Sequence, residues 1–192
     1  MNKKGKKIEP EVCIILDIHG YNNIPIIVRN KDTEILYMGH VMKFNKPSYI
    51  IRKEIINKLN NLITEFNPNM IIFEQNKLFI DKIDKHPDPL MLRNIMLGFG
   101  IKVSIEDNYN DTIPYILEIP EQDWRFTILN KSVKYAIDLY KAHIEYQFVT
   151  EEQINLIHEN NYYKVICFSE SIQYDSLMNK KYQINRKDKE NQ

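Results

Sequence analysis

Close to its N-terminus the chain carries an almost continuous apolar run that contains one acid, Val12-Cys13-Ile14-Ile15-Leu16-Asp17-Ile18. Unbroken apolar residues, in place of alternating ones, are typical of a strand that is buried on both faces of a sheet. Two further strands are predicted over residues 24–28 and 34–41, and only short links with turn residues separate the three. Short links join antiparallel neighbours, so the sequence predicts an antiparallel meander here.

The apolar period changes from strand-like to helix-like after this meander. Between Ser48 and Phe66 apolar residues recur every three or four positions, which predicts a helix that ends at Asn67 and Pro68. An apolar strand over residues 70–74, Met-Ile-Ile-Phe-Glu, follows and again ends in an acid. Because a helical crossover precedes it, we expect this strand to run parallel to a strand of the meander.

The remaining chain is predicted to contain both helices and strands. The predicted elements are a helix over 89–98, a fifth strand over 101–105, a polar loop over 106–112 and another strand over 115–119. Further helices are expected over 121–129, over 132–146, from residue 150 and over most of 163–182. Together these elements predict an α/β fold, in which three antiparallel strands and then parallel strands form one mixed sheet flanked by helices.

Length and composition fit one globular domain over residues 11–182, between a basic tail (1–10) and a charged tail (183–192). Of the 192 residues, 43% are hydrophobic and 27% are charged, which argues against wholesale disorder. No apolar run is long enough for a membrane span or a signal peptide, and Cys13 and Cys167 lie in apolar segments typical of buried thiols. We therefore expect a cytoplasmic protein that is neither secreted nor bound to a membrane.

The charge balance bears on nucleic-acid binding. The 26 Lys and Arg residues equal the 26 Asp and Glu residues in number, which argues against strong non-specific binding of DNA by charge alone. Basic residues cluster at both chain ends, however, and a neutral total can hide a basic rim around an acidic site. The excess of Ile, Asn and Lys indicates AT-rich coding, as in a low-GC bacterium, a phage or a virus.

Two acids, Asp17 and Glu74, each close an apolar strand. If these two strands are neighbours in the sheet, both carboxylates lie at the same edge. Burying charges there is costly unless they are paired or bound to metal, and convergent carboxylates suit Mg²⁺ or Mn²⁺. Two such ions about 4 Å apart would activate water for the cleavage of a phosphodiester. The alternative is that each acid sits at a strand end exposed to solvent.

The order of these elements, together with residues 71–79, resembles the RuvC-type Holliday junction resolvases of the RNase H-like fold. Members of that family carry an Asp on the first strand and a Glu followed by Gln on the fourth, and Asp17 and Glu74-Gln75 occupy those places. Residues 119–125, 132–137 and 174–178 resemble later segments of the family, the first of them as found in phage members. The resemblance spans about residues 11–180.

The resemblance implies an endonuclease of phage or viral type that cleaves branched DNA as a homodimer, in recombination, repair or viral genome processing. It implies two Mg²⁺ or Mn²⁺ ions, held by Asp17, Glu74, Asp175 and Glu170. Lys134 would contact the scissile phosphate or its neighbour. Further contacts to the DNA backbone are expected from Lys131, Arg125 and Lys141.

The last metal ligand departs from the family pattern. The terminal helix of the family offers two acids three residues apart, whereas the acid that precedes Asp175 is Glu170, five residues before it. Residues five apart lie on different faces of a regular helix. Glu106 and Asp107, which follow the predicted strand 101–105, are candidate replacements.

Several residues allow two interpretations. His19 could bind metal or orient water, or it could be a turn histidine without a role. Trp124 could stack on a base or pack a helix onto the sheet, and Lys134 and Lys141 could face phosphate or solvent.

Three other classes of protein stay open for the chain as a whole. The first is a relative that kept the fold and nucleic-acid binding but lost catalysis. The second is an actin-like or sugar-kinase-like ATPase fragment, for which the five glycines leave little material for phosphate-binding turns. The third is a phage or viral structural protein.

Overall fold

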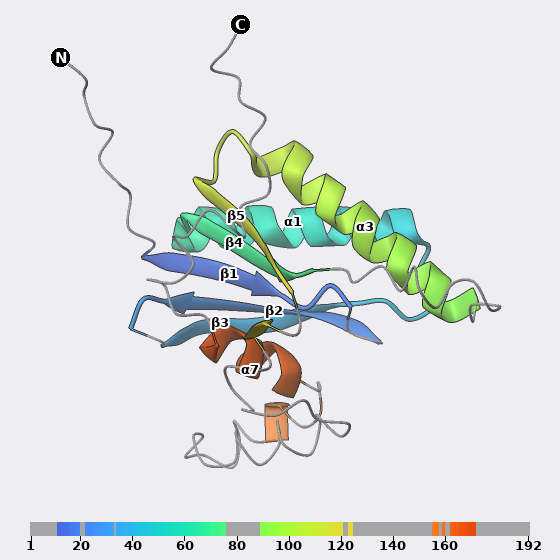
Figure 1. Ribbon diagram of the computed structural model, residues 1–192, viewed down its shortest axis with the longest axis horizontal. Coiled ribbons are helices and arrows are strands. Elements are labelled where there is room, and N and C mark those ends of the chain that lie inside the picture. Colours follow the sequence, from blue (N-terminus) through green and yellow to red (C-terminus); the bar gives the residue numbers. More distant parts are fainter. Residues whose placement is uncertain are drawn as a thin grey trace, which may run out of the picture.

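The computed structural model describes residues 11–19, 22–32, 34–75, 89–120, 123–124, 155–157, 159 and 162–171 (Figure 1). Five strands of these segments form one mixed sheet in the order β3-β2-β1-β4-β5. The strands are β1 (Val12–Leu16), β2 (Asn23–Asn30), β3 (Ile35–Met42), β4 (Met70–Glu74) and β5 (Tyr115–Ile119).

The central strand of the sheet is β1. It pairs antiparallel with β2 and parallel with β4, while β3 extends the sheet antiparallel to β2 and β5 extends it parallel to β4. The predicted meander, crossover helix and parallel strand are therefore confirmed. The central position also explains the unbroken apolar run, because the β1 residues from Cys13 to Leu16 are fully buried.

Helices cover both faces of the sheet. The helices α1 (Ser48–Phe66) and α3 (Pro89–Tyr109) lie on one face, and α7 (Tyr163–Glu170) lies on the other (Figure 1). Side chains of β1 alternate between the two sides: Ile14 and Leu16 pack in the core under α1 and α3, and Cys13 and Ile15 pack in the core under α7. Both cysteines are buried thiols, as predicted.

The prediction of a strand over 101–105 and a loop over 106–112 is wrong, because α3 continues as one helix to Tyr109. Leu97, Ile101, Ile105 and Tyr109 are all buried and recur every four residues, which is the period of a helix face. The parallel strand that follows β4 is instead β5, at the place predicted for the later strand. Glu106 and Asp107 thus lie in a helix rather than at a strand end, so their proposed role as replacement ligands loses its basis.

Other predicted segments fall partly or wholly outside the described residues. These are both tails, the helices over 121–129 and 132–146, the helix from residue 150, and residues 172–182. The helix expected within 163–182 is confirmed over its first part by α7. Among the helices that the structure describes, none combines the length and the apolar character needed to cross a membrane.

Candidate active site

Asp17 and Glu74 lie side by side at the carboxyl ends of β1 and β4. The parallel register pairs Leu16 with Phe73. Asp17 directly follows Leu16, the last residue of β1, and Glu74 directly follows Phe73 as the last residue of β4. Both residues are only 3% exposed. The convergence expected from the strand order is therefore present, whereas the alternative of solvent-exposed strand ends is wrong.

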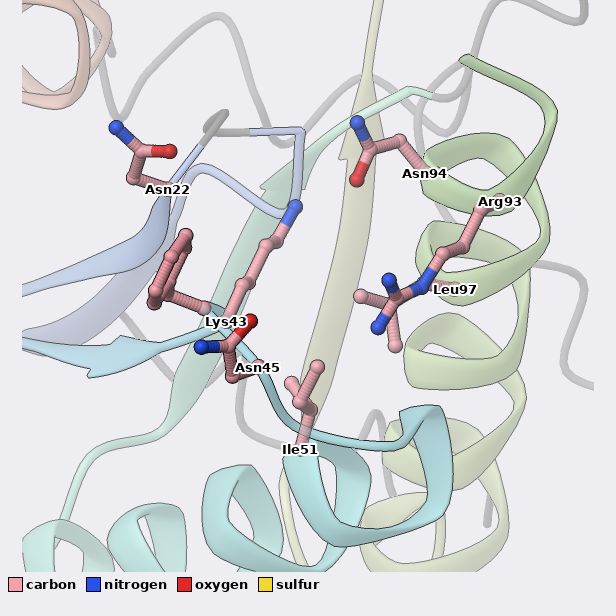
Figure 2. Close-up of a pocket in the computed structure, with 8 residues that line it drawn as sticks. Asn22, Lys43, Asn45, Ile51, Arg93, Asn94 and Leu97 are labelled. Atoms are coloured by element: carbon pink, nitrogen blue, oxygen red, sulfur yellow. The ribbon is translucent and has the colours of Figure 1, made fainter. Parts of the chain in front are cut away.

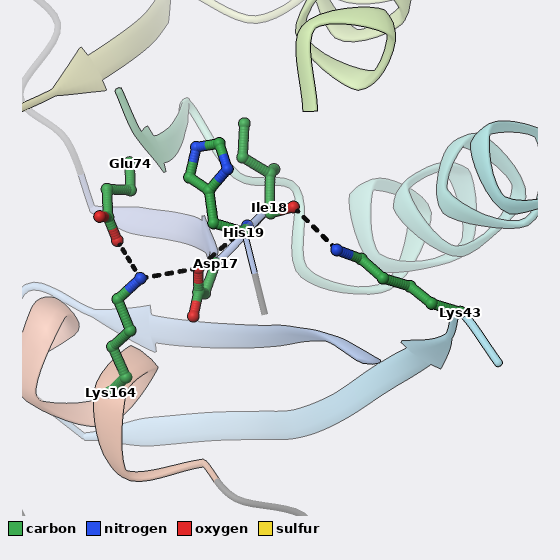
Figure 3. A network of polar contacts seen from close by, with 6 residues as sticks. All are labelled: Asp17, Ile18, His19, Lys43, Glu74 and Lys164. Carbon is green, nitrogen blue, oxygen red and sulfur yellow. Dashed lines mark hydrogen bonds and ion pairs between the residues drawn. The ribbon is translucent and has the colours of Figure 1, made fainter. Parts of the chain in front are cut away.

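One lysine joins the two carboxylates. The Lys164 Nζ lies 2.6 Å from Glu74 Oε2 and 3.2 Å from Asp17 Oδ1, so that one ammonium bridges both acids (Figure 3). Lys164 is the second residue of α7, whose apolar residues pack against the sheet and bring this side chain to its edge. Burial by itself would raise the pKa of Asp17, but the charge of Lys164 and hydrogen bonds to the carboxylate outweigh it, and the pKa lies below its usual value.

His19 lies in the turn that follows β1 and contacts both acidic residues. Its backbone N–H donates to Asp17 Oδ1 at 3.1 Å. Desolvation lowers the pKa of the imidazole to about 4, although the charge of Asp17 and a hydrogen bond with the Glu74 backbone act in the opposite direction. The ring is therefore neutral at pH 7. Its Nε2 is buried and has no hydrogen-bond partner among the residues that the structure describes.

A second buried lysine lies next to this turn. Lys43 directly follows β3, is only 6% exposed, and directs its Nζ to the carbonyl oxygen of Ile18 at 3.4 Å (Figure 3). Desolvation lowers the pKa of Lys43 to about 8. Because Ile18 directly follows Asp17, two cationic side chains, Lys43 and Lys164, reach the end of β1 from different elements.

Lys164 and Lys43 are not among the site residues predicted from the sequence. A signal for Lys164 exists, since it is the single charge in the apolar stretch Tyr-Tyr-Lys-Val-Ile-Cys-Phe over 162–168. A lone lysine within a helix that is otherwise buried usually has an acidic partner. For Lys43 no comparable signal exists, because its burial depends on how the loop after β3 folds back.

Glu170 does not join the two acids. It is the last residue of α7, six positions after Lys164, and so points about 120° away from Lys164 around the helix axis. In the described segments no group of three or more His, Cys, Asp and Glu side chains is placed to hold a metal ion. The other predicted site residues lie outside the described residues: Asp175, Lys134, Lys131, Lys141 and Arg125.

Trp124 packs in the core, as one of its two interpretations predicted. It is buried, and its ring centroid lies 5.3 Å from that of Phe168 in α7. An indole in this position is covered by the helix and has no open face for a nucleic-acid base. Trp124 therefore helps to seat the helix that carries Lys164.

The two carboxylates form a donor set that fits a divalent cation under one condition. Mg²⁺ is commonly bound by one or two carboxylates together with water and phosphate oxygens, and Asp17 and Glu74 supply two such groups. The Lys164 ammonium is within hydrogen-bond distance of both carboxylates. An ion that uses both acids must therefore take the place of this ammonium.

Solved structures with a similar fold are known, although the sequence itself matches no known family. No family model and no curated protein matches the sequence. RuvC of T. thermophilus in complex with a Holliday junction substrate gives a TM-score of 0.59 at 8% identity, over 91% of this chain and 99% of that one. Another Thermus thermophilus RuvC structure gives 0.55 at 9% identity, over 90% and 99%.

A mitochondrial enzyme has the same architecture. The yeast mitochondrial Holliday junction resolvase Ydc2 gives a TM-score of 0.52 at 13% identity, over 83% of this chain and 75% of Ydc2. At such low identities the likeness shows the fold alone. The chain thus has the RuvC-like form of the RNase H-like fold, a five-stranded mixed sheet flanked by helices.

Proposed function

We propose that this chain is a structure-specific endonuclease that cleaves branched DNA such as the Holliday junction. The observation that carries the proposal is the pair of buried carboxylates, Asp17 and Glu74, at the ends of two neighbouring strands of a RuvC-like sheet. Two buried acids at one position are costly in a structural protein, whereas a nuclease needs them as metal ligands. The RuvC neighbour in complex with a Holliday junction substrate supports the choice of branched DNA.

Asp17 and Glu74 would hold Mg²⁺ or Mn²⁺ once Lys164 has moved aside. When bound, such an ion supplies an activated water and stabilises the charge on the leaving oxygen. The His19 backbone N–H keeps the Asp17 carboxylate in one orientation. We retain two ions in this proposal, with Asp175 as the further expected ligand, and Lys134, Lys131, Arg125 and Lys141 as the expected phosphate contacts. Glu170 is left out of the ligand set, because its place on α7 turns it away from Lys164 and the two acids.

A homodimer belongs to the proposal, because resolution of a four-way junction requires two paired cuts. An exposed apolar stripe on α3 supports it: Leu92, Met96 and Phe99 lie at positions i, i+4 and i+7 and so share one helix face. Met96 is 64% exposed and Phe99 53% exposed. A two-fold axis through this stripe would bury it against its own copy.

The site of action follows from the substrate. An enzyme of this kind would work in the cytoplasm of a bacterium or of a virus-infected cell, where its DNA is found. The composition supports a phage or viral source within this proposal, because abundant Ile, Asn and Lys indicate AT-rich coding.

Replacement of the central acid tests the proposed function. Asp17→Asn removes one charge without changing the size of the side chain, and we expect cleavage of a four-way junction in Mg²⁺ to fall by at least a hundredfold, or about 2.7 kcal/mol in the barrier. Junction binding in EDTA should persist, because the fold and the surrounding cations are kept. Cleavage is measured on a labelled synthetic junction, and binding by fluorescence anisotropy.

Asp32→Asn is the matched control, since this exposed acid lies in the turn after β2, at the opposite end of β1 from Asp17. It should cleave as the unmodified protein does. Equal cleavage by Asp17→Asn and by the unmodified chain would exclude the proposed site. Binding without any cleavage by the unmodified chain would instead identify a relative that kept the fold and lost catalysis.

A further inference from the structure

A pocket of about 230 Å³ lies beside the turn that follows Asp17, between the loop after β3 and the start of α3 (Figure 2). Lys43 extends into it from the end of β3, and Arg93 and Asn94 face it from α3 (Figure 2). The remaining lining includes the side-chain amides of Asn22 and Asn45. None of the lining residues carries a carboxylate.

The two cations of this pocket are not neutralised within the described part of the chain. Lys46, in the same loop, is paired with Glu54 at 2.6 Å, whereas Lys43 and Arg93 form no ion pair with a described acid. The hydrogen bond from Lys43 to the Ile18 carbonyl is long, at 3.4 Å. Arg93 donates from Nη2 to the Lys46 carbonyl at 2.7 Å, which fixes its guanidinium at the pocket while leaving other N–H donors for a ligand.

A buried ammonium without a carboxylate partner is costly, and an anion in the pocket would remove that cost. Desolvation, the charge of Lys164 and the charge of Arg93 lower the pKa of Lys43, while Asp17 raises it, so the net effect of these surroundings is to disfavour its charge. The amide groups and guanidinium suit oxygen acceptors in particular. One aromatic side chain of the lining, Phe44, is 68% exposed and offers a face on which a base can stack.

We propose that this pocket is a nucleotide subsite of the DNA strand that passes the Asp17–Glu74 pair, with Lys43 and Arg93 on a backbone phosphate and Phe44 against a base. The inference rests on the proposed function. It goes beyond that function by identifying the residues that would contact the DNA strand next to Asp17 and Glu74. Ile18 links the two sites directly, because its carbonyl accepts from Lys43 and its chain neighbour is Asp17.

Salt-dependent binding of a four-way junction tests the subsite. Binding of the full chain is measured by fluorescence anisotropy in EDTA at several salt concentrations, so that cleavage plays no part. The slope of log K against log salt concentration is negative, and loss of one phosphate contact makes it less steep by about 1, so we expect this change for Lys43→Gln and for Arg93→Gln. Phe44→Ala should weaken binding about tenfold at every salt concentration without changing the slope, because stacking releases no counterions.

Lys31→Gln is the matched control, since Lys31 is exposed in the turn after β2, at the opposite end of β1 from Asp17. It removes the same charge and should leave the slope unchanged. Arg93 is exposed, so Arg93→Gln tests the pocket even if Lys43→Gln fails to fold. Slopes for Lys43→Gln and Arg93→Gln equal to that of the unmodified chain would overturn the subsite.

The two proposals fail in different ways. A chain that binds and cleaves the junction, but whose pocket variants behave as Lys31→Gln does, contradicts the subsite alone. A chain that does not bind the junction at all contradicts the proposed function. Inorganic phosphate is the third arm: if it raises the melting temperature of the unmodified chain but not of Lys43→Gln, while the junction slopes stay equal, the pocket takes a free anion and the nucleic-acid assignment is overturned.

Discussion

Two buried carboxylates share one ammonium group in this molecule. Without a cation nearby, two acids this deeply buried would not both stay ionised, because each charge disfavours the other and water is excluded. Lys164 supplies that cation at 2.6 Å from Glu74 and 3.2 Å from Asp17. Lys164 thus meets the charge requirement of the site, and in the proposed function a divalent ion would meet it in place of this ammonium.

Lys164→Gln should therefore change both stability and metal affinity. In EDTA the two acids lose their shared partner, and we expect the free energy of unfolding to fall by about 3 kcal/mol. With the competing cation gone, the dissociation constant for Mn²⁺ should fall about tenfold or more, and saturating Mn²⁺ should restore much of the lost stability. Urea unfolding with and without Mn²⁺ and isothermal titration calorimetry measure these effects.

Lys102→Gln provides the comparison for this variant. Lys102 pairs with Glu118 at 2.6 Å and its side chain is about as exposed as that of Lys164, 25% against 26%. It should lose a smaller amount of stability, because only one acid loses a partner, and its Mn²⁺ affinity should stay unchanged. An unchanged Mn²⁺ affinity for Lys164→Gln as well would show that the ammonium and the ion do not compete.

Helix α3 shows how burial overrides local sequence signals. Gly98 and Gly100 indicate a helix end, and the β-branched residues after them favour a strand. The sequence therefore predicted a helix that stops at residue 98 and a strand over 101–105. In the structure Ile101 and Ile105 continue the buried face that Leu97 begins. Packing of this face against α1 outweighs the weak propensity of glycine and isoleucine for a helix.

A substitution at Gly100 distinguishes the two assignments. Within a helix, Gly100→Ala should raise the free energy of unfolding by about 0.5 kcal/mol, since alanine favours helix by about 0.5–1 kcal/mol over glycine. An added Cβ would lie 3.1 Å from Cδ of Arg52, an exposed side chain that can shift. Urea unfolding measures the change.

Gly39→Ala is the opposite case, because a Cβ at Gly39 would collide with the Tyr37 hydroxyl. This variant should be destabilised. If Gly100→Ala lost stability in the same way, residue 100 would not lie within a regular helix.

The order of strands was predictable because it depends on short links and on buried apolar runs. The convergence of Asp17 and Glu74 follows from that order and from one crossover helix. The sequence marks Lys164 as a lone charge in an apolar helix but does not identify the acids that it meets, because Lys164 is 147 residues from Asp17 in sequence and reaches it only through the packing of α7. Lys43 was missed for the same kind of reason, since a lysine after a strand is usually solvated.

For the whole chain, the equal numbers of acidic and basic residues conceal an uneven distribution. Two of the acids are buried beside Lys164, and the pocket next to them contains only cations among its charged residues. A neutral protein gains little affinity for DNA from its total charge. If the proposed function holds, the affinity of this chain for a junction should therefore depend on a few placed groups and on the proposed pairing of two subunits, each with one site.

The α3 stripe is where that pairing should occur. Met96→Glu places a charge in the middle of the stripe, and burying it against a second copy would be costly. We expect the dissociation constant of the dimer to rise at least a hundredfold, or about 2.7 kcal/mol. Analytical ultracentrifugation measures it, and paired junction cuts should become single nicks. Leu36→Glu, at an exposed position of β3, is the control and should stay dimeric. If Met96→Glu also stayed dimeric, the interface would lie elsewhere. If the unmodified chain were a monomer, the proposed dimer would be excluded.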